Sequence, residues 1–192
     1  MHTPAHLAVS LLVWHREPGR AAAWAVGLGA ALPDLPMFGF YGYQKLVAKS
    51  TEHAIWSTLY FDPGWQLFFD IFNSIPLMLA VMGLSVWRRW RFGWLLAGSA
   101  LLHLLFDLPL HHDDAHRHLL PLTHWRFASP VSYWDPAHFG HVVVWVELAG
   151  ALAACGWVAR RGEHRPMRAL AWGTLGLYAL ALMLVLGWLM SR

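Results

Sequence analysis

The sequence predicts an all-α integral membrane protein, a helical bundle with about five transmembrane helices and a short helix ahead of them. Of the 192 residues, 57% are apolar and only 13% are charged, which is outside the usual balance of soluble domains. The apolar residues stand in blocks long enough to cross a bilayer. The 13 tryptophans fit the aromatic belts that anchor such helices at the membrane interfaces. We therefore expect one membrane domain over residues 1–192, in contact with the lipid bilayer, and no nucleic-acid partner.

The first two predicted elements are a short helix and an interrupted span. Ala5–Trp14 is apolar but too short to cross about 30 Å of hydrocarbon, so it predicts a short or re-entrant helix with Thr3 as its N-cap. Ala21–Phe40 is long enough to span, but Pro33 and Pro36 interrupt it. We therefore expect a kinked span there, with irregular backbone that only a polar cavity tolerates at membrane depth.

Four later segments are apolar over lengths that approach or exceed the roughly 20 residues that a transmembrane helix needs. They are Trp65–Trp87, Phe92–Leu110, His141–Val158 and Ala169–Met190. The last of them is an additional helix beyond residues 1–147, which hold the candidate site residues. The single cysteine, Cys155, excludes an intrachain disulfide framework and a cysteine-rich metal site.

Basic residues predict the orientation of the spans. Three basic clusters fall at alternate ends of successive spans: Arg16 and Arg20; Arg88, Arg89 and Arg91; and Arg160, Arg161, Arg165 and Arg168. The positive-inside rule places all three clusters in the cytoplasm. Most histidines and acids then lie toward the opposite, outer side. The sequence thus predicts a multi-pass protein of a bacterial inner membrane whose metal-binding residues lie toward the periplasm.

The clearest local signal is an imidazole and a carboxylate inside an apolar helix. His103 and Asp107 are four residues apart, so one helical turn places them on the same face. An ionised carboxylate near the centre of a transmembrane helix costs roughly 2.5 to 3.5 kcal/mol, so such a residue normally faces a partner, a cavity or an ion. We expect both side chains to bind a metal ion. A hydrogen bond that joins two helices is the alternative.

A dense group of potential ligands follows that helix. The stretch from His111 to His118 holds four histidines and two aspartates. Such density favours zinc or another borderline divalent ion. Adjacent side chains diverge, so only some of them can bind one ion, and His111, His112 and His116 are the candidate ligands. A solvated polar loop is the alternative.

Further candidates lie outside these two motifs. His6 belongs to the predicted short helix, and Asp34 lies between the prolines of the kinked span. His53, in an outer loop, and His141, at the start of a span, are each a candidate ligand or a surface histidine. Glu147 lies within a span and is a candidate general base or a partner of a ligand.

At these residues the sequence resembles a family of bacterial membrane-bound, metal-dependent hydrolases, also described as LexA-binding, inner-membrane-associated hydrolases. The resemblance spans roughly residues 1–147. It is carried by Met1–His6, Ala31–Asp34, the pair His103 and Asp107, and the later loop. Two stretches, Asp107–Ala115 and Ser129–Pro136, look like a proteobacterial membrane subgroup that is sometimes mislabelled as a cobalamin biosynthesis protein.

The family is similar in turn to zinc-dependent phospholipase C and P1-type nucleases, helical proteins that gather His and Asp ligands around several zinc ions to cleave phosphoesters. The positions that match best are His6, Asp34, His103 and Asp107. His53 stands where the family has an Arg-x-x-Thr-His-Ser-like stretch, from which this sequence departs. The His-x-x-x-Glu pair of the soluble enzymes is absent, since tryptophan occupies the fourth position after His141.

These observations together predict a membrane-embedded hydrolase that uses one or more Zn²⁺, or another divalent metal, to cleave a phosphoester of a lipid or lipid-linked substrate at the outer leaflet. Asp34, Asp107 and Glu147 are the candidate catalytic groups. Three other interpretations stay open: a divalent-metal transporter or sensor, a membrane di-iron oxidase, and a structural scaffold. Transport needs a polar route to the inner side, where the only acids are Glu17 and Glu163.

Overall fold

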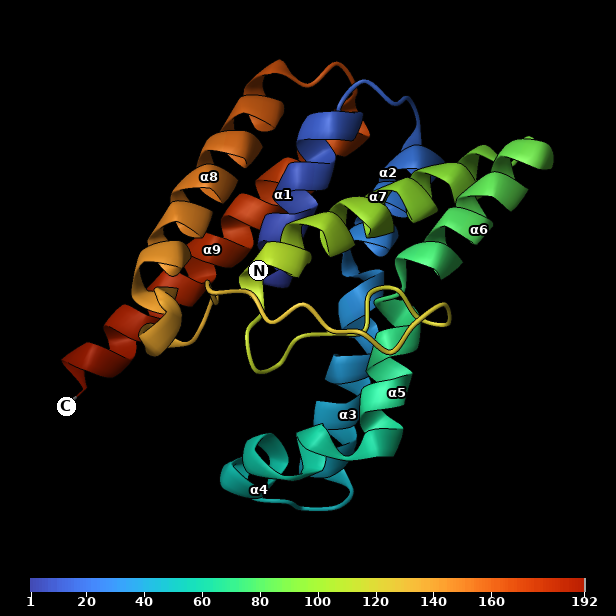
Figure 1. The fold of residues 1–192 in the computed structure, drawn as a ribbon. Helices are drawn as coiled ribbons and strands as arrows, with labels where there is room; N and C mark the ends of the chain where they lie inside the picture. Colours follow the sequence, from blue (N-terminus) through green and yellow to red (C-terminus); the bar gives the residue numbers. More distant parts are fainter. Residues whose placement is uncertain (192) are drawn as a thin grey trace.

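The structure is a computed structural model that describes residues 1–191. These residues form an all-helical bundle, with α3, α4 and α5 extending below the other helices (Figure 1). In chain order the elements are α1 (Thr3–Trp14), α2 (Arg20–Ala31), the 3-10 turn η1 (Leu32–Asp34), α3 (Leu35–Leu46), α4 (Glu52–Ser57), η2 (Leu59–Phe61), α5 (Pro63–Phe72), α6 (Ile75–Trp87), α7 (Arg91–Asp107), η3 (Leu108–Leu110), η4 (Pro136–His138), α8 (Gly140–Arg161) and α9 (Arg165–Met190).

Five helical segments of the described chain are long and apolar enough to cross a membrane, and α1 is a shorter apolar helix beside them. The five are Arg20–Leu46, Pro63–Trp87, Arg91–Leu110, Gly140–Arg161 and Arg165–Met190. This confirms the predicted fold class and indicates a multi-pass membrane protein. The predicted interruption of the first span is also present, because the 3-10 turn η1, which contains Pro33, separates α2 from α3.

The second span is interrupted as well, between α5 and α6, where the sequence predicted one continuous helix. The Asn73 amide donates to the carbonyl of Pro33 (3.3 Å), and the Ser74 hydroxyl accepts from Leu77 N (3.2 Å) as the N-cap of α6. Ser74 also donates to the Leu120 carbonyl. These bonds satisfy groups that a broken helix would otherwise leave unpaired at membrane depth.

The start of α1 differs from the prediction. The N-cap position is His2, and Thr3 is the first helical residue. The Thr3 hydroxyl does not cap the helix but donates to Asp34 Oδ2 at 2.5 Å. The prediction of Thr3 as N-cap was therefore wrong, because the helix begins one residue earlier than expected.

Small residues let the central helices approach closely. Gly29 of α2 faces α7 so tightly that an added Cβ would lie 2.2 Å from the Leu96 carbonyl oxygen and 2.8 Å from Ser99 Cβ. Buried alanines of α1, α2, α8 and α9 pack around Leu11, Val26 and Leu95. The core therefore sets the separation of α2 and α7, the two helices that flank the candidate site.

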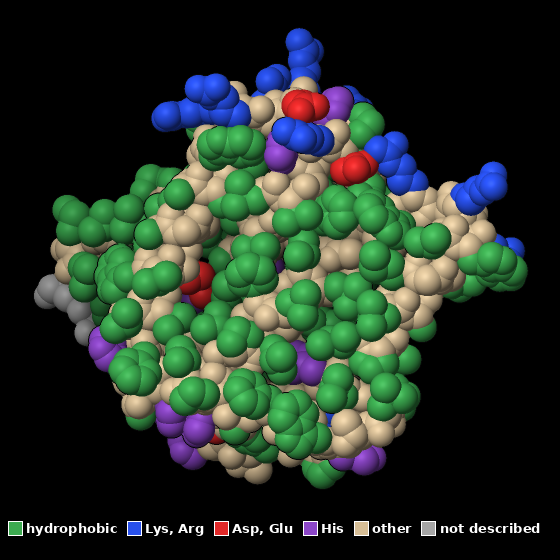
Figure 2. All heavy atoms as spheres, turned by 45° about the horizontal axis from the view of Figure 1, so that its top comes forward, with side chains coloured by type: hydrophobic (Ala, Val, Ile, Leu, Met, Phe, Trp, Pro, Cys, Tyr) green, Lys and Arg blue, Asp and Glu red, His purple; other side chains and the backbone are tan. Residues whose placement is uncertain are grey.

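The three basic clusters lie at one end of the bundle. Figure 1 shows the α1–α2, α6–α7 and α8–α9 connections at the same end, and Figure 2 shows the Lys and Arg side chains gathered there above a broad hydrophobic surface. Two ion pairs link the connections: Arg16 with Glu163 at 3.1 Å, and Arg91 with Glu17. The common end is as predicted, and its cytoplasmic location stays a prediction.

Candidate metal centre

Three buried side chains from two helices form a group that could hold a metal ion. His6 comes from α1, and His103 and Asp107 from α7. One ligand atom of each lies within 4.8 Å of the other two, and the three residues are 1%, 1% and 3% exposed. The four-residue spacing on α7 places His103 and Asp107 together as predicted, with His103 Nε2 at 3.0 Å from Asp107 Oδ2.

The hydrogen bonds of His103 leave its Nε2 suited to a cation. Its Nδ1 lies 2.7 Å from the Ala30 carbonyl, which can only accept, so Nδ1 carries the proton. In a neutral ring Nε2 then holds a lone pair, and it faces a carboxylate oxygen that also only accepts. Two acceptors face each other here, and a proton or a metal ion between His103 Nε2 and the Asp107 carboxylate would remove their repulsion.

His6 adds a second unsatisfied imidazole. Its Nε2 lies 2.9 Å from Asp107 Oδ1 without hydrogen-bond geometry, and neither of its ring nitrogens has a hydrogen-bond partner among the described residues. The ring stacks on that of His103, with centroids 3.4 Å apart and planes 6° apart. Buried polar atoms are rarely left unpaired, so these nitrogens fit the metal-binding interpretation.

Asp34 and His111 lie next to this group. Asp34 Oδ1 is 3.6 Å from His103 Nε2, and its other oxygen is held by Thr3. His111 Nε2 is 3.4 Å from Asp107 Oδ2 and is buried without a hydrogen bond, while its Nδ1 lies 2.8 Å from Asp114 Oδ2. Both residues are thus within a short movement of the same centre. A carboxylate that holds Nδ1 is typical of histidines that bind metals.

Electrostatics favour a cation at this position. Burial lowers the pKa of His111, but the carboxylates of Asp107 and Asp114 outweigh burial and raise that pKa to about 9. Desolvation raises the pKa of Asp114, but the hydrogen bond from His111 outweighs it and the net pKa lies below its usual value. The surroundings therefore stabilise positive charge, which a bound metal ion would supply in place of a proton.

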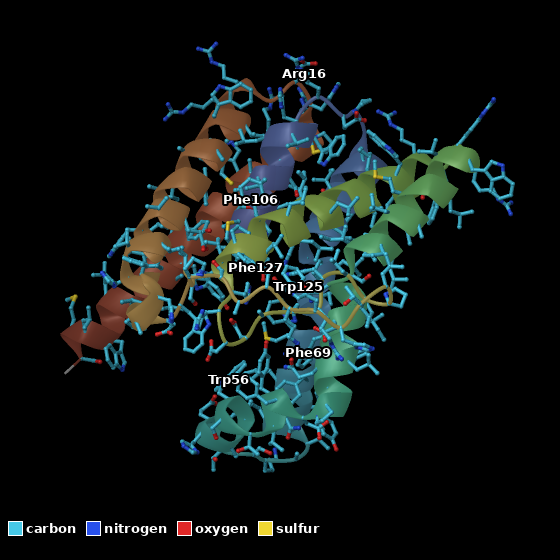
Figure 3. The ribbon with its side chains drawn as sticks, in the orientation of Figure 1. Arg16, Trp56, Phe69, Phe106, Trp125 and Phe127 are labelled. Atoms are coloured by element: carbon cyan, nitrogen blue, oxygen red, sulfur yellow. The ribbon has the colours of Figure 1, made fainter. Side chains whose placement is uncertain are left out.

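A cavity of about 740 Å³ opens beside the group. Asp34, Asp107 and His111 line it near the candidate ligands. Aromatic side chains line it elsewhere, among them Trp56 and Phe69, which Figure 3 shows far from Arg16 at the basic end. Four aspartates line the cavity, and the cation among its described lining residues is the ammonium of Met1, which pairs with Asp107 Oδ1 at 2.5 Å. A metal ion on Asp107 would compete with this ammonium. The cavity is thus acidic where the ligands converge and mainly apolar otherwise.

The remaining predicted ligands lie outside the buried group. His53 is exposed on α4, where its ring contacts Ser57, and His141 is exposed in the first turn of α8. His112 places Nδ1 on the Ser129 carbonyl (2.6 Å) and stacks on His138. His116 lines the cavity, but its Nδ1 lies 3.2 Å from Asp70.

Glu147 also lies outside the group, and its partner is a residue that the sequence did not single out. Its Oε1 accepts from the His2 backbone N (3.0 Å) and lies 2.8 Å from His2 Nδ1. His2 lines the cavity, and its ring packs edge-on against Tyr133. The available signal for His2 was its position four residues before His6 in the N-terminal motif.

The second missed feature is the anchor of the polar loop (residues 111–139). Asp70 is fully buried in α5 and receives hydrogen bonds from Arg117 N (3.0 Å) and from the Arg117 guanidinium. His116 and Arg126 also lie within ion-pair distance of it. Asp70 thus fixes this loop over the cavity.

Comparison of the chain with protein-family models, with curated proteins and with solved structures finds no match.

Proposed function

We propose that this protein is a membrane-embedded, zinc-dependent hydrolase that cleaves a phosphoester of a lipid or lipid-linked substrate at the outer leaflet. The observation that carries the proposal is the convergence of His6, His103 and Asp107 beside a large cavity, where neither ring nitrogen of His6 has a hydrogen bond among the described residues. Buried ionisable groups in membrane helices are costly and are typically functional.

The donor set suits zinc. Two imidazoles and a carboxylate are common zinc ligands, and three protein ligands leave a coordination position for water or substrate. Asp34 and His111 supply further donors at the edge of the group. A bound Zn²⁺ would acidify water and neutralise the negative charge that develops on a phosphoryl oxygen.

The cavity suits a substrate with a polar head and an apolar tail. Asp34, Asp107 and His111 line its polar part, and Met37, Phe38 and Phe61 are among its apolar lining. Phe38 and Phe61 are themselves exposed, so the apolar lining is continuous with the surface that faces lipid in a bilayer. We infer that a lipid enters sideways from the leaflet.

The residues of the chain divide into three roles in this proposal. His6, His103 and Asp107 hold the metal ion, and Asp34 completes the site or orients water. His2, oriented by Glu147 through Nδ1, exchanges a proton with water or the leaving oxygen through Nε2. Glu147 is then a positioning residue, which refines the prediction of Glu147 as a general base.

The core weighs against transport as the function. Leu11, Val26 and Leu95 are fully buried between the site and the basic end. An ion crossing the bundle would need ligating groups along this path. Beside these apolar side chains the described core offers the buried hydroxyls of Ser10 and Ser99, but no carboxylate or imidazole.

The test is metal content together with hydrolysis. We expect the purified protein to contain near-stoichiometric zinc, and to cleave a fluorescent phospholipid in mixed micelles until a chelator removes the metal. The double variant His103→Ala/Asp107→Ala should lose most of the zinc and the activity. The matched control is His141→Ala, which removes an exposed histidine outside the group and should change neither.

Other results would redirect or overturn the proposal. Stoichiometric iron in place of zinc would favour oxygen chemistry. Absence of any metal would favour a structural role for the buried histidines. Phospholipid turnover that is undiminished after chelation would contradict the proposal directly.

A further inference from the structure

A second cavity, of about 410 Å³, lies at the basic end of the bundle, remote from the candidate metal centre. It is a groove between α2 and α9, lined by Arg20, Ala23, Trp24, Arg165, Ala169 and Leu170 among others. Arg20 and Arg165 are the first residues of their helices. The groove therefore carries two cations at its end and an apolar wall along the helices.

The two arginines have no anionic partner in the described part of the chain. At the same end Arg16 pairs with Glu163 and Arg91 pairs with Glu17, which uses both acids of that end. No ion pair to Arg20 or Arg165 is formed by the described residues. Two like charges that share one groove repel each other, and neither helix has an acidic residue in its first turn to offset them.

The rest of the groove suits a hydrocarbon chain. Ala23 and Ala169 leave room between the helices, and Leu170 lies close enough that a Cβ on Gly27 would contact it at 3.8 Å. Trp24 is 65% exposed, at the level where indole rings sit at a membrane interface. The positive charge at the end of the groove matches an anionic lipid head group, and the apolar wall beyond it matches an acyl chain.

From this arrangement we infer that the α2–α9 groove binds an anionic phospholipid, with its phosphate on Arg20 and Arg165 and an acyl chain along Ala169 and Leu170. Basic pockets between transmembrane helices on the cytoplasmic side are suited to such head groups. The inference is independent of metal binding and of hydrolysis, so it can hold or fail on its own.

Native mass spectrometry of the detergent-solubilised protein tests the inference, with dioleoyl phosphatidylglycerol as probe and dioleoyl phosphatidylcholine as comparison. We expect preferential binding of phosphatidylglycerol. Arg20→Gln/Arg165→Gln should weaken that binding roughly thirtyfold, because each basic residue near a membrane surface contributes about one kcal/mol. Inorganic phosphate should not displace the lipid, since it lacks the chain.

Two further variants separate a built site from general surface charge. Arg160→Gln/Arg161→Gln removes two exposed arginines at the same end and should leave the affinity within about twofold. Ala169→Phe keeps both charges but fills the groove from an exposed position, and it should weaken binding too. Equal loss in both arginine pairs, or equal binding of the two lipids, would overturn the inference. Displacement by inorganic phosphate would show an anion site without lipid recognition and would also overturn it.

Discussion

At the scale of single residues, the most informative pair is His2 with Glu147. The Glu147 side chain is only 4% exposed and lies within a candidate span, yet it accepts two hydrogen bonds from a residue at the other end of the chain. A buried carboxylate that holds Nδ1 fixes the ring orientation and leaves Nε2 to exchange a proton. This arrangement separates metal binding from proton transfer.

That separation gives a prediction about Glu147. Glu147→Leu removes the acceptor and should lower kcat by roughly tenfold to hundredfold with the zinc content unchanged, since His2 loses its orientation. Glu147→Gln keeps a side-chain carbonyl that can accept from Nδ1 and should retain most of the activity. Steady-state kinetics and metal analysis of the same preparations are the measurements. Zinc loss in Glu147→Leu would instead assign the residue to the metal centre.

His103 shows what the local spacing of two residues can predict about a site and what it cannot. Its spacing from Asp107 predicted their shared face, and the structure agrees. The spacing says nothing about the Ala30 carbonyl, which sets the protonation of the ring, because that contact depends on how α2 packs against α7. Predicting a ligand is therefore easier than predicting what orients it.

At the scale of elements, the close approach of α2 and α7 controls the site. Gly29→Ala would place Cβ at 2.2 Å from the Leu96 oxygen, so the helices must separate. We expect a loss of about 1–3 kcal/mol in stability and a lower zinc content, since Ala30 and Asp34 would move away from His103. Thermal unfolding in detergent and metal analysis measure the two effects. Gly39→Ala is the control, because nothing lies within 4 Å of its added Cβ; equal effects of both substitutions would refute the argument.

Interrupted spans show the limit of sequence patterns for elements. Prolines announced the break at η1 because they remove a backbone donor. The break between α5 and α6 also has a proline, Pro76 in the first turn of α6, but the hydropathy continues across it. Loop carbonyls of His118 and Leu120, far along the chain, stabilise the break. The prediction of one continuous helix gave too little weight to Ser74 and Pro76, which together are typical of a helix start.

At the scale of the whole molecule, apolar length and basic clusters predicted the spans and their common end. Apolar length and basic clusters could not predict which histidines of the polar loop lie near the buried group. The path of that loop is set by the buried Asp70 and by backbone contacts. Of the dense stretch that begins at His111, only that first residue approaches the buried group. Composition thus predicted more candidate ligands than the structure brings together in the buried group.

The orientation of the bundle is open to a direct measurement. In a Cys155→Ala background, Thr123→Cys places a thiol in the polar loop and Arg161→Cys places one at the basic end. Because arginines are retained in the cytoplasm, a membrane-impermeant maleimide should label the first variant in intact spheroplasts and the second only after permeabilisation. Labelling in the reverse order would place the candidate metal centre toward the cytoplasm and contradict the outer-leaflet proposal.

The anchoring of the polar loop at Asp70 has a consequence for hydration. Donors of residues 116, 117 and 126 converge on this one carboxylate, and Ser74 and Ile75 hold the same loop through the carbonyls of Leu120 and His118. We expect Asp70 to influence how readily bulk water enters the large cavity, and hence how quickly a bound metal ion exchanges with solvent. Asp70, which contacts neither the metal ion nor the lipid, would then control solvent access to the candidate metal centre.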